Sequence, residues 1–204
     1  MPDDDRTPKG PNDVTTTQPP ATLDAERTDL LTELADARAD LVATTEGLGD
    51  EQVSARPTVS ELCLGGLVKH VAAMEQQWLR FVVEGPSAMH YDLPDGVTWA
   101  DIAAGTAREF PRWMTEHRNG FRLLPGETLA GILDHYARVA ARSAEIIAAV
   151  PDLSATHPLP EAPWHEPGAV YSIRRVLLRV IAETTRHAGH ADILRESIDG
   201  RKSS

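Results

Sequence analysis

Four stretches of this chain repeat their apolar residues every three or four positions, which is the period of an amphipathic helix. They cover residues 23–48, 64–84, 129–150 and 173–199. No segment alternates apolar and polar residues over the length of a strand, and no Asn-Gly hairpin signal is present. The pattern therefore predicts an all-α protein, and four long helices favour a four-helix bundle.

Capping and helix-breaking residues set the expected ends of these helices. Gly85, followed by a proline, ends the second helix. Thr128 caps the third helix, which Pro151 closes. Ser172 caps the last helix, and this helix ends before Gly200.

Two parts of the chain lack this regularity. Residues 1–21 hold acidic, proline and threonine residues with almost no large apolar side chain, so we expect a disordered tail followed by one domain over residues 22–204. Residues 86–127 separate the second and third helices. Because long structureless loops are rare within compact domains, we expect a long crossover that carries one or two short helices.

Charge and cysteine content exclude several classes of function. The formal net charge of -11, with scattered lysines and arginines, argues against nucleic-acid binding. No apolar run reaches the roughly 18 residues that a membrane span needs, and the acidic N-terminus does not resemble a secretory signal. The single cysteine, Cys63, cannot form an intrachain disulfide. We therefore expect a cytoplasmic protein that is a monomer or a homodimer.

The last helix carries the residues that most suggest chemistry. Glu183, His187 and His190 lie on one side of it, beside its apolar stripe. Such groups facing a core are costly unless something binds them. Glu183 and His187 are four residues apart and could ligate one divalent metal, although spacing alone does not separate His187 from His190. The competing interpretation is that Glu183 pairs with a nearby arginine, which could be Arg175, Arg179 or Arg186.

A metal site in a bundle also needs a ligand from a facing helix. His70 lies at the edge of the apolar stripe of the second helix, whereas His135 lies nearer the solvent side of the third. His70 is therefore the expected third ligand. Two imidazoles and one carboxylate suit Zn²⁺ best, with Ni²⁺, Fe²⁺ or Mn²⁺ as alternatives, and three protein ligands leave a position open for water or substrate.

The other candidate residues have simpler interpretations. Cys63 is expected to be a small buried residue rather than a reactive thiol. The tryptophans are expected to anchor the core or the loops, and the loop histidines to face solvent. Among these histidines, His165 is the most plausible one to reach the site, because its loop leads into the last helix. The tryptophans are Trp78, Trp99, Trp113 and Trp164, and the other loop histidines are His90, His117 and His157.

Two stretches closely resemble the signature helices of the DinB-like superfamily. They are LGGLVKHVAAMEQQW at residues 64–78 and ETTRHAGHADILRE at residues 183–196. The likeness is greatest to the actinobacterial branch of small proteins related to mycothiol-dependent maleylpyruvate isomerase, and it covers residues 22–198. It implies a four-helix bundle that binds one divalent metal through three side chains.

The resemblance also implies roles for individual residues. It assigns the three metal ligands to His70, Glu183 and His187. It makes His190 a residue that orients a ligand without binding the metal itself. The implied activity is a metal-dependent transfer or isomerisation reaction in which a small thiol such as mycothiol attacks an electrophilic small molecule. The alternatives are a hydrolase that uses metal-bound water and a non-catalytic metal-binding protein of a stress response.

Overall fold

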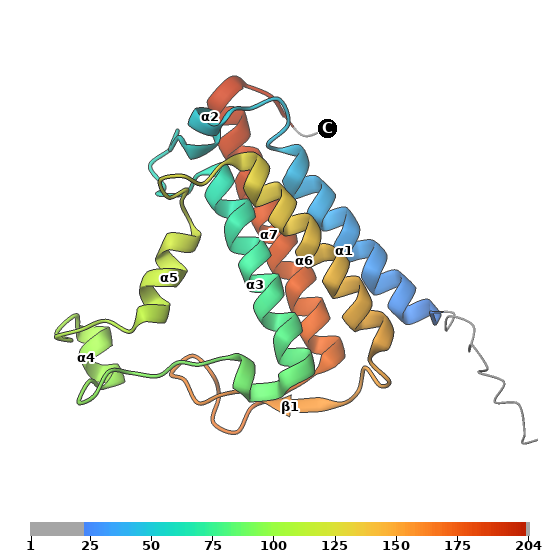
Figure 1. Cartoon of the computed structure of the whole chain (residues 1–204), viewed down its shortest axis with the longest axis vertical. Helices are drawn as coiled ribbons and strands as arrows, with labels where there is room; N and C mark the ends of the chain where they lie inside the picture. The colour runs from blue at the N-terminus through green and yellow to red at the C-terminus, as the bar shows by residue number, and fades with distance from the viewer. Residues whose placement is uncertain (1–22, 203–204) are drawn as a thin grey trace, which may run out of the picture.

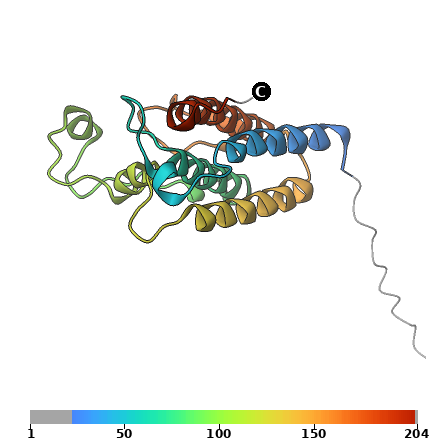
Figure 2. The same ribbon diagram turned by 90° about the horizontal axis from the view of Figure 1, so that it is seen from above.

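The computed structural model describes residues 23–202, and four long helices form its frame (Figure 1). Seen from above, α1 lies beside α7, α7 beside α3, and α3 beside α6, so the four helices enclose a common core (Figure 2). The prediction of an all-α four-helix bundle is confirmed. The long helices are α1 (Ala25–Ala43), α3 (Leu64–Glu84), α6 (Leu129–Ala149) and α7 (Ile173–Asp199).

The helix ends follow the capping residues. The side chains of Asp24, Thr128 and Ser172 accept hydrogen bonds from backbone N–H groups in the first turns of α1, α6 and α7. The expected first helix was too long, because α1 ends at Ala43 instead of continuing to residue 48. The hydroxyl of Thr44 turns back to the carbonyl of Leu41, at 2.7 Å, and so satisfies a carbonyl group at the end of the helix.

The long connection between α3 and α6 carries two short helices, as expected. A single 3-10 turn, η1 (Gly85–Ala88), follows α3, and then come α4 (Trp99–Ala104) and α5 (Arg112–Gly120). This crossover stands out from the α3 side of the bundle (Figure 1). A further short helix, α2 (Asp50–Ser54), precedes α3.

The structure corrects the expectation of a chain without strands. β1 (Thr156–Pro158) and β2 (Val170–Ser172) pair antiparallel between α6 and α7. Three residues are too few to show an alternating pattern in the sequence. The expected tail, residues 1–21, lies outside the described residues, and the division into tail and domain stays a prediction. No helix within residues 23–202 is long and apolar enough to cross a membrane.

The apolar core falls into two clusters, and a buried polar layer lies between them along the helices. Glu75 of α3 is fully buried and accepts a 3.0 Å hydrogen bond from Nε of Arg38 and a 2.5 Å bond from Oγ of Ser143. Tyr136 lies in the same layer, and burial, followed by the charge of Glu75, raises the pKa of its phenol. The layer thus joins α1, α3 and α6 in the middle of the bundle.

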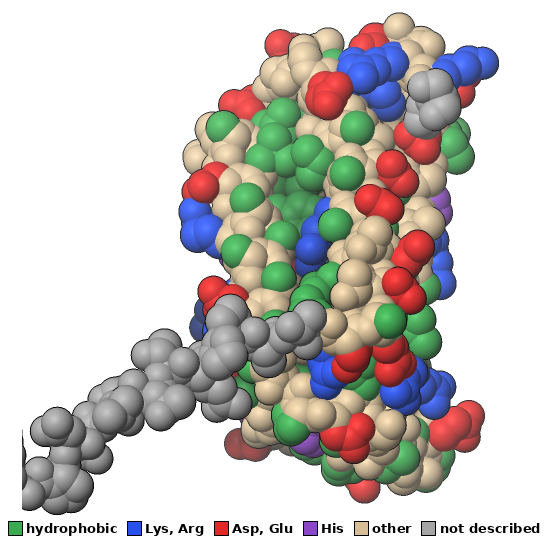
Figure 3. Space-filling model, turned by 90° about the vertical axis from the view of Figure 1, so that its right-hand side faces the viewer, with side chains coloured by type: hydrophobic (Ala, Val, Ile, Leu, Met, Phe, Trp, Pro, Cys, Tyr) green, Lys and Arg blue, Asp and Glu red, His purple; other side chains and the backbone are tan. Residues whose placement is uncertain are grey.

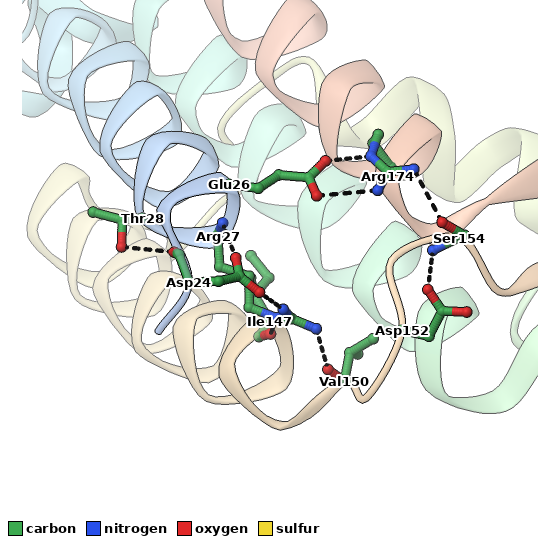
Figure 4. Close-up of polar contacts among 9 residues, drawn as sticks. All are labelled: Asp24, Glu26, Arg27, Thr28, Ile147, Val150, Asp152, Ser154 and Arg174. Carbon is green, nitrogen blue, oxygen red and sulfur yellow. Dashed lines mark hydrogen bonds and ion pairs between the residues drawn. The ribbon is translucent and has the colours of Figure 1, made fainter. Parts of the chain in front are cut away.

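The lower end of the bundle is closed by polar contacts of α1 (Figure 4). Arg27 donates to the carbonyls of Ile147 and Val150 at the end of α6, at 3.3 and 2.6 Å. Glu26 pairs with Arg174 at the start of α7. Figure 3 views the side of the molecule on which α1 and α6 lie, and it shows a hollow with hydrophobic side chains on its floor.

Candidate metal centre

Histidines from three helices gather on the side of the bundle that faces the crossover. The ring centroid of His70, on α3, lies 5.0 Å from that of His187, on α7, and 5.5 Å from that of His117, on α5. His190 follows one turn after His187, with their Nδ1 atoms 3.4 Å apart. Phe121 stacks on the His70 ring with a centroid distance of 3.8 Å and an interplanar angle of 22°.

A pair of glycines explains how the crossover comes so close to His70. A Cβ atom at Gly66 would lie 2.1 Å from the carbonyl oxygen of Phe121, and one at Gly65 would lie 2.3 Å from the side chain of Leu123. Glycine at position 66 therefore lets the backbone of residues 121–122 pack directly against the first turn of α3, whereas the Leu123 side chain beside Gly65 could shift. This contact places the ring of Phe121 over His70.

Both central imidazoles are held in their neutral form. Burial, together with the nearby His187 and His117, lowers the pKa of His70 to about 3. Burial is also the largest cause that lowers the pKa of His187, followed by His190, while Glu183 opposes the shift. Neutral imidazole is the form that binds a metal. His70 makes no hydrogen bond to any residue in the described part of the chain.

Glu183 is turned toward its own helix neighbours. Its carboxylate lies 3.5 Å from Arg179 and 3.2 Å from Arg186, and its side chain is 16% exposed. The arginine pairing considered as the competing interpretation of Glu183 is therefore present for two of the three arginines. Within residues 23–202, no three His, Cys, Asp or Glu side chains are already arranged around one metal position.

The two imidazoles nevertheless have the separation that a shared metal requires. A zinc-like ion bound by two imidazole nitrogens at about 2.0 to 2.1 Å, with a tetrahedral angle, would set their ring centroids about 5 Å apart. The observed 5.0 Å between His70 and His187 fits this value. Glu183 lies one turn before His187, so it could join them by a change of side-chain rotamer that releases its arginines.

The other sequence candidates lie away from this cluster or face solvent. His135 lines a groove between α3 and α6. Cys63 is buried, as expected, with Sγ 3.7 Å from the carbonyl of Phe121. His165 does not reach the site, because its Nδ1 is 2.9 Å from the carbonyl of Pro160 and its ring packs beside Trp164.

Three tryptophans anchor the crossover, whereas Trp78 lies in the core. The rings of Trp99, Trp113 and Trp164 lie 5.3 to 6.1 Å apart, and they pack together with Tyr91. This cluster joins the crossover to the loop before α7. The prediction of core and loop anchors is confirmed.

Sequence reasoning missed two neighbours of His70. His117 was assigned to a solvated segment, and its side chain is exposed, yet one edge of its ring faces His70. The stacking of Phe121 on His70 became visible only in the structure, where the end of the crossover packs against α3. The Gly65-Gly66 pair was the available signal, because two adjacent glycines in a helix often mark a place where another backbone packs closely.

The fold and the histidine cluster define a class of helical bundle. In it, two neighbouring helices bring largely shielded histidines together beside a long crossover. Comparison with known families then identifies the chain. It belongs to the mycothiol-S-transferase family, whose sequence profile matches residues 29–200.

A solved structure shows the same fold. The chain is similar to a conserved protein from Enterococcus faecalis, with 14% sequence identity and a TM-score of 0.57 over 88% of this chain and 100% of that one. At this identity the likeness concerns the fold alone. Comparison with curated proteins finds no match.

Proposed function

We propose that this protein is a metal-dependent thiol transferase whose metal is held by His70, Glu183 and His187. The observation that carries the proposal is the pair of imidazoles on α3 and α7, one half-buried and one buried, whose pKa values are lowered and whose ring centroids are 5.0 Å apart. The mycothiol-S-transferase family supports a small thiol as one substrate. Zinc suits this donor set best, and a cytoplasmic location agrees with the single cysteine of the chain.

When bound, a divalent metal would lower the pKa of a coordinated thiol, so that the nucleophilic thiolate is present at neutral pH. The sulfur would then form a bond to an electrophilic atom of the second substrate. In a substitution the displaced group leaves with the electron pair of the broken bond. In an addition the electron pair moves onto the substrate, which takes up a proton.

The surrounding residues of the chain support the proposed roles. Phe121 covers one face of His70, which limits its ring orientations and excludes water from that face. The Nδ1 contact between His190 and His187 leaves Nε2 of His187 free to face the site. To act as a ligand, Glu183 would have to give up its contacts with Arg179 and Arg186.

Calorimetric titration with Zn²⁺, followed by mycothiol, tests this proposal. We expect one zinc per chain, and we expect mycothiol to bind only to the zinc-loaded protein. The variant His135→Ala is the matched control, because it removes a histidine outside the cluster and should leave both titrations unchanged. Zinc binding without any thiol binding would favour the alternative of a non-catalytic metal-binding protein.

A further inference from the structure

A second cavity, of about 560 Å³, lies between the segment before α3 and the helix α5. Three of its lining side chains are cationic, and they are Arg56, Arg118 and Arg122. Its single acidic side chain is Glu61, which is 93% exposed and only 3.9 Å from Arg56. This local excess of positive charge stands out in a chain whose formal net charge is -11.

Two of these arginines have no acidic partner within residues 23–202. Most arginines in residues 23–202 form ion pairs, but Arg118 and Arg122 make none with a described residue. Both side chains are exposed to solvent, and the guanidinium of Arg118 lies 6.0 Å from the ring centroid of Phe110. Arg122 donates only to the neutral side chain of Asn119.

A structural role accounts for part of this arrangement. Arg118 lies in the last turn of α5, where a positive charge is favourable beside the free carbonyl groups of the helix end. Arg122 lies beyond that helix, and its charge has no comparable partner. Arg118 and Arg122 line one cavity together with Thr115 and Asn119, and guanidinium, hydroxyl and amide groups are donors that bind carboxylates and phosphates.

We propose that this cavity binds the anionic group, a carboxylate or a phosphate, of a small-molecule ligand. Phe121 connects the cavity to the histidine cluster, because it lines the cavity and its ring stacks on His70. A ligand anchored by Arg118 and Arg122 would therefore lie beside Phe121, next to the histidine cluster, and would be the electrophilic substrate of the proposed reaction. This last step, in which the ligand is the electrophilic substrate, rests on the proposed function, whereas the anion binding does not.

Anion binding can be measured without metal or thiol. The metal-free protein is titrated with inorganic phosphate and, separately, with acetate at constant ionic strength, and backbone amide shifts are followed by NMR. We expect saturable shifts at Thr115, Arg118, Asn119 and Arg122. The double variant R118Q/R122Q should weaken binding by about tenfold or more, since it removes both uncompensated charges.

Arg108→Gln is the matched control. Arg108 is another arginine of the crossover without an ion pair to a described residue, and it does not line the cavity, so its loss should leave the affinity unchanged. Saturation by phosphate alone identifies a phosphoryl ligand, and saturation by acetate alone identifies a carboxylate. An equal loss of affinity in the Arg108 variant, or the absence of saturable shifts at the cavity in the wild-type protein, would overturn the proposal, whatever the result of the zinc and mycothiol titrations.

Discussion

At the scale of single residues, two imidazoles of the cluster are partly shielded from water and therefore resist protonation. The pKa of His70 falls to about 3, mainly because of burial, and that of His187 is lowered for the same reason. Below pH 6.5 the unfolded chain takes up protons at these positions more readily than the folded chain does. The contribution of these two histidines to the unfolding free energy is therefore fully present above pH 6.5. It is lost as the pH falls toward their pKa values in the folded state.

This protonation difference predicts the acid sensitivity of the metal-free protein. His70 should remove about 1.4 kcal/mol of unfolding free energy per pH unit between pH 6.5 and its folded pKa of about 3. Urea unfolding between pH 7 and 4.5 measures the slope. His70→Gln should make it shallower by close to that amount, because glutamine does not titrate, and an unchanged slope would show that His70 is solvated in the native protein.

The two C-terminal histidines should differ in their effect on metal binding. His187→Ala removes a proposed ligand and should abolish zinc binding. His190→Ala removes only the imidazole whose Nδ1 lies 3.4 Å from Nδ1 of His187. Zinc should therefore still bind, with roughly a 10- to 100-fold loss of affinity. Competition with a chelator measures both affinities, and complete loss in both variants would show that the ligands are wrongly assigned.

At the scale of elements, the contact between α3 and residues 121–123 positions the cluster. Gly66→Ala should push this segment away, because its Cβ would lie 2.1 Å from the carbonyl oxygen of Phe121. We expect a loss of about 1 to 3 kcal/mol in unfolding free energy together with weaker zinc binding. Gly189→Ala is the control, because nothing lies within 4 Å of the added methyl group and alanine favours a helix by up to about 1 kcal/mol. Equal destabilisation by both variants would contradict this role of Gly66.

The helices could be predicted from the sequence because their information is local. The period of the apolar residues gave the four long helices, and the caps Thr128 and Ser172 gave the starts of α6 and α7 within a residue. The contact of His117 and Phe121 with His70 could not be predicted in this way. It depends on how a 42-residue irregular segment, residues 86–127, returns to α3, and the periodicity of the chain carries no information about that path.

At the scale of the whole molecule, the polar layer of Glu75, Arg38 and Ser143 lies between the two apolar clusters and joins three helices. Glu75 lies within the apolar stripe of α3, four residues after Val71 and three before Trp78, so the pattern itself indicated burial. The sequence does not show that Arg38 and Ser143 pair with it, because that depends on how the helices pack. Such a layer favours one register of the bundle, since a shifted helix would leave a buried charge without its partner.

Removal of one partner from this layer should be costly. Glu75→Ala leaves Arg38 without its acid in a mostly buried position, and we expect a loss of about 3 to 5 kcal/mol in unfolding free energy. Glu33→Ala, at an exposed position of α1, should change stability by less than about 0.5 kcal/mol. Chemical denaturation measures both, and similar small losses would contradict the proposed role of the layer.

The most direct test of the proposed function is the absorption spectrum of the cobalt-substituted protein. Co²⁺ occupies zinc-type sites, and its visible bands report the coordination number, while a thiolate ligand adds a charge-transfer band in the near ultraviolet. We predict one Co²⁺ per chain, a charge-transfer band on addition of mycothiol, and the loss of both in His70→Ala and His187→Ala. Cobalt bound without that band, or bound equally well by both variants, would contradict thiol activation at the histidine cluster.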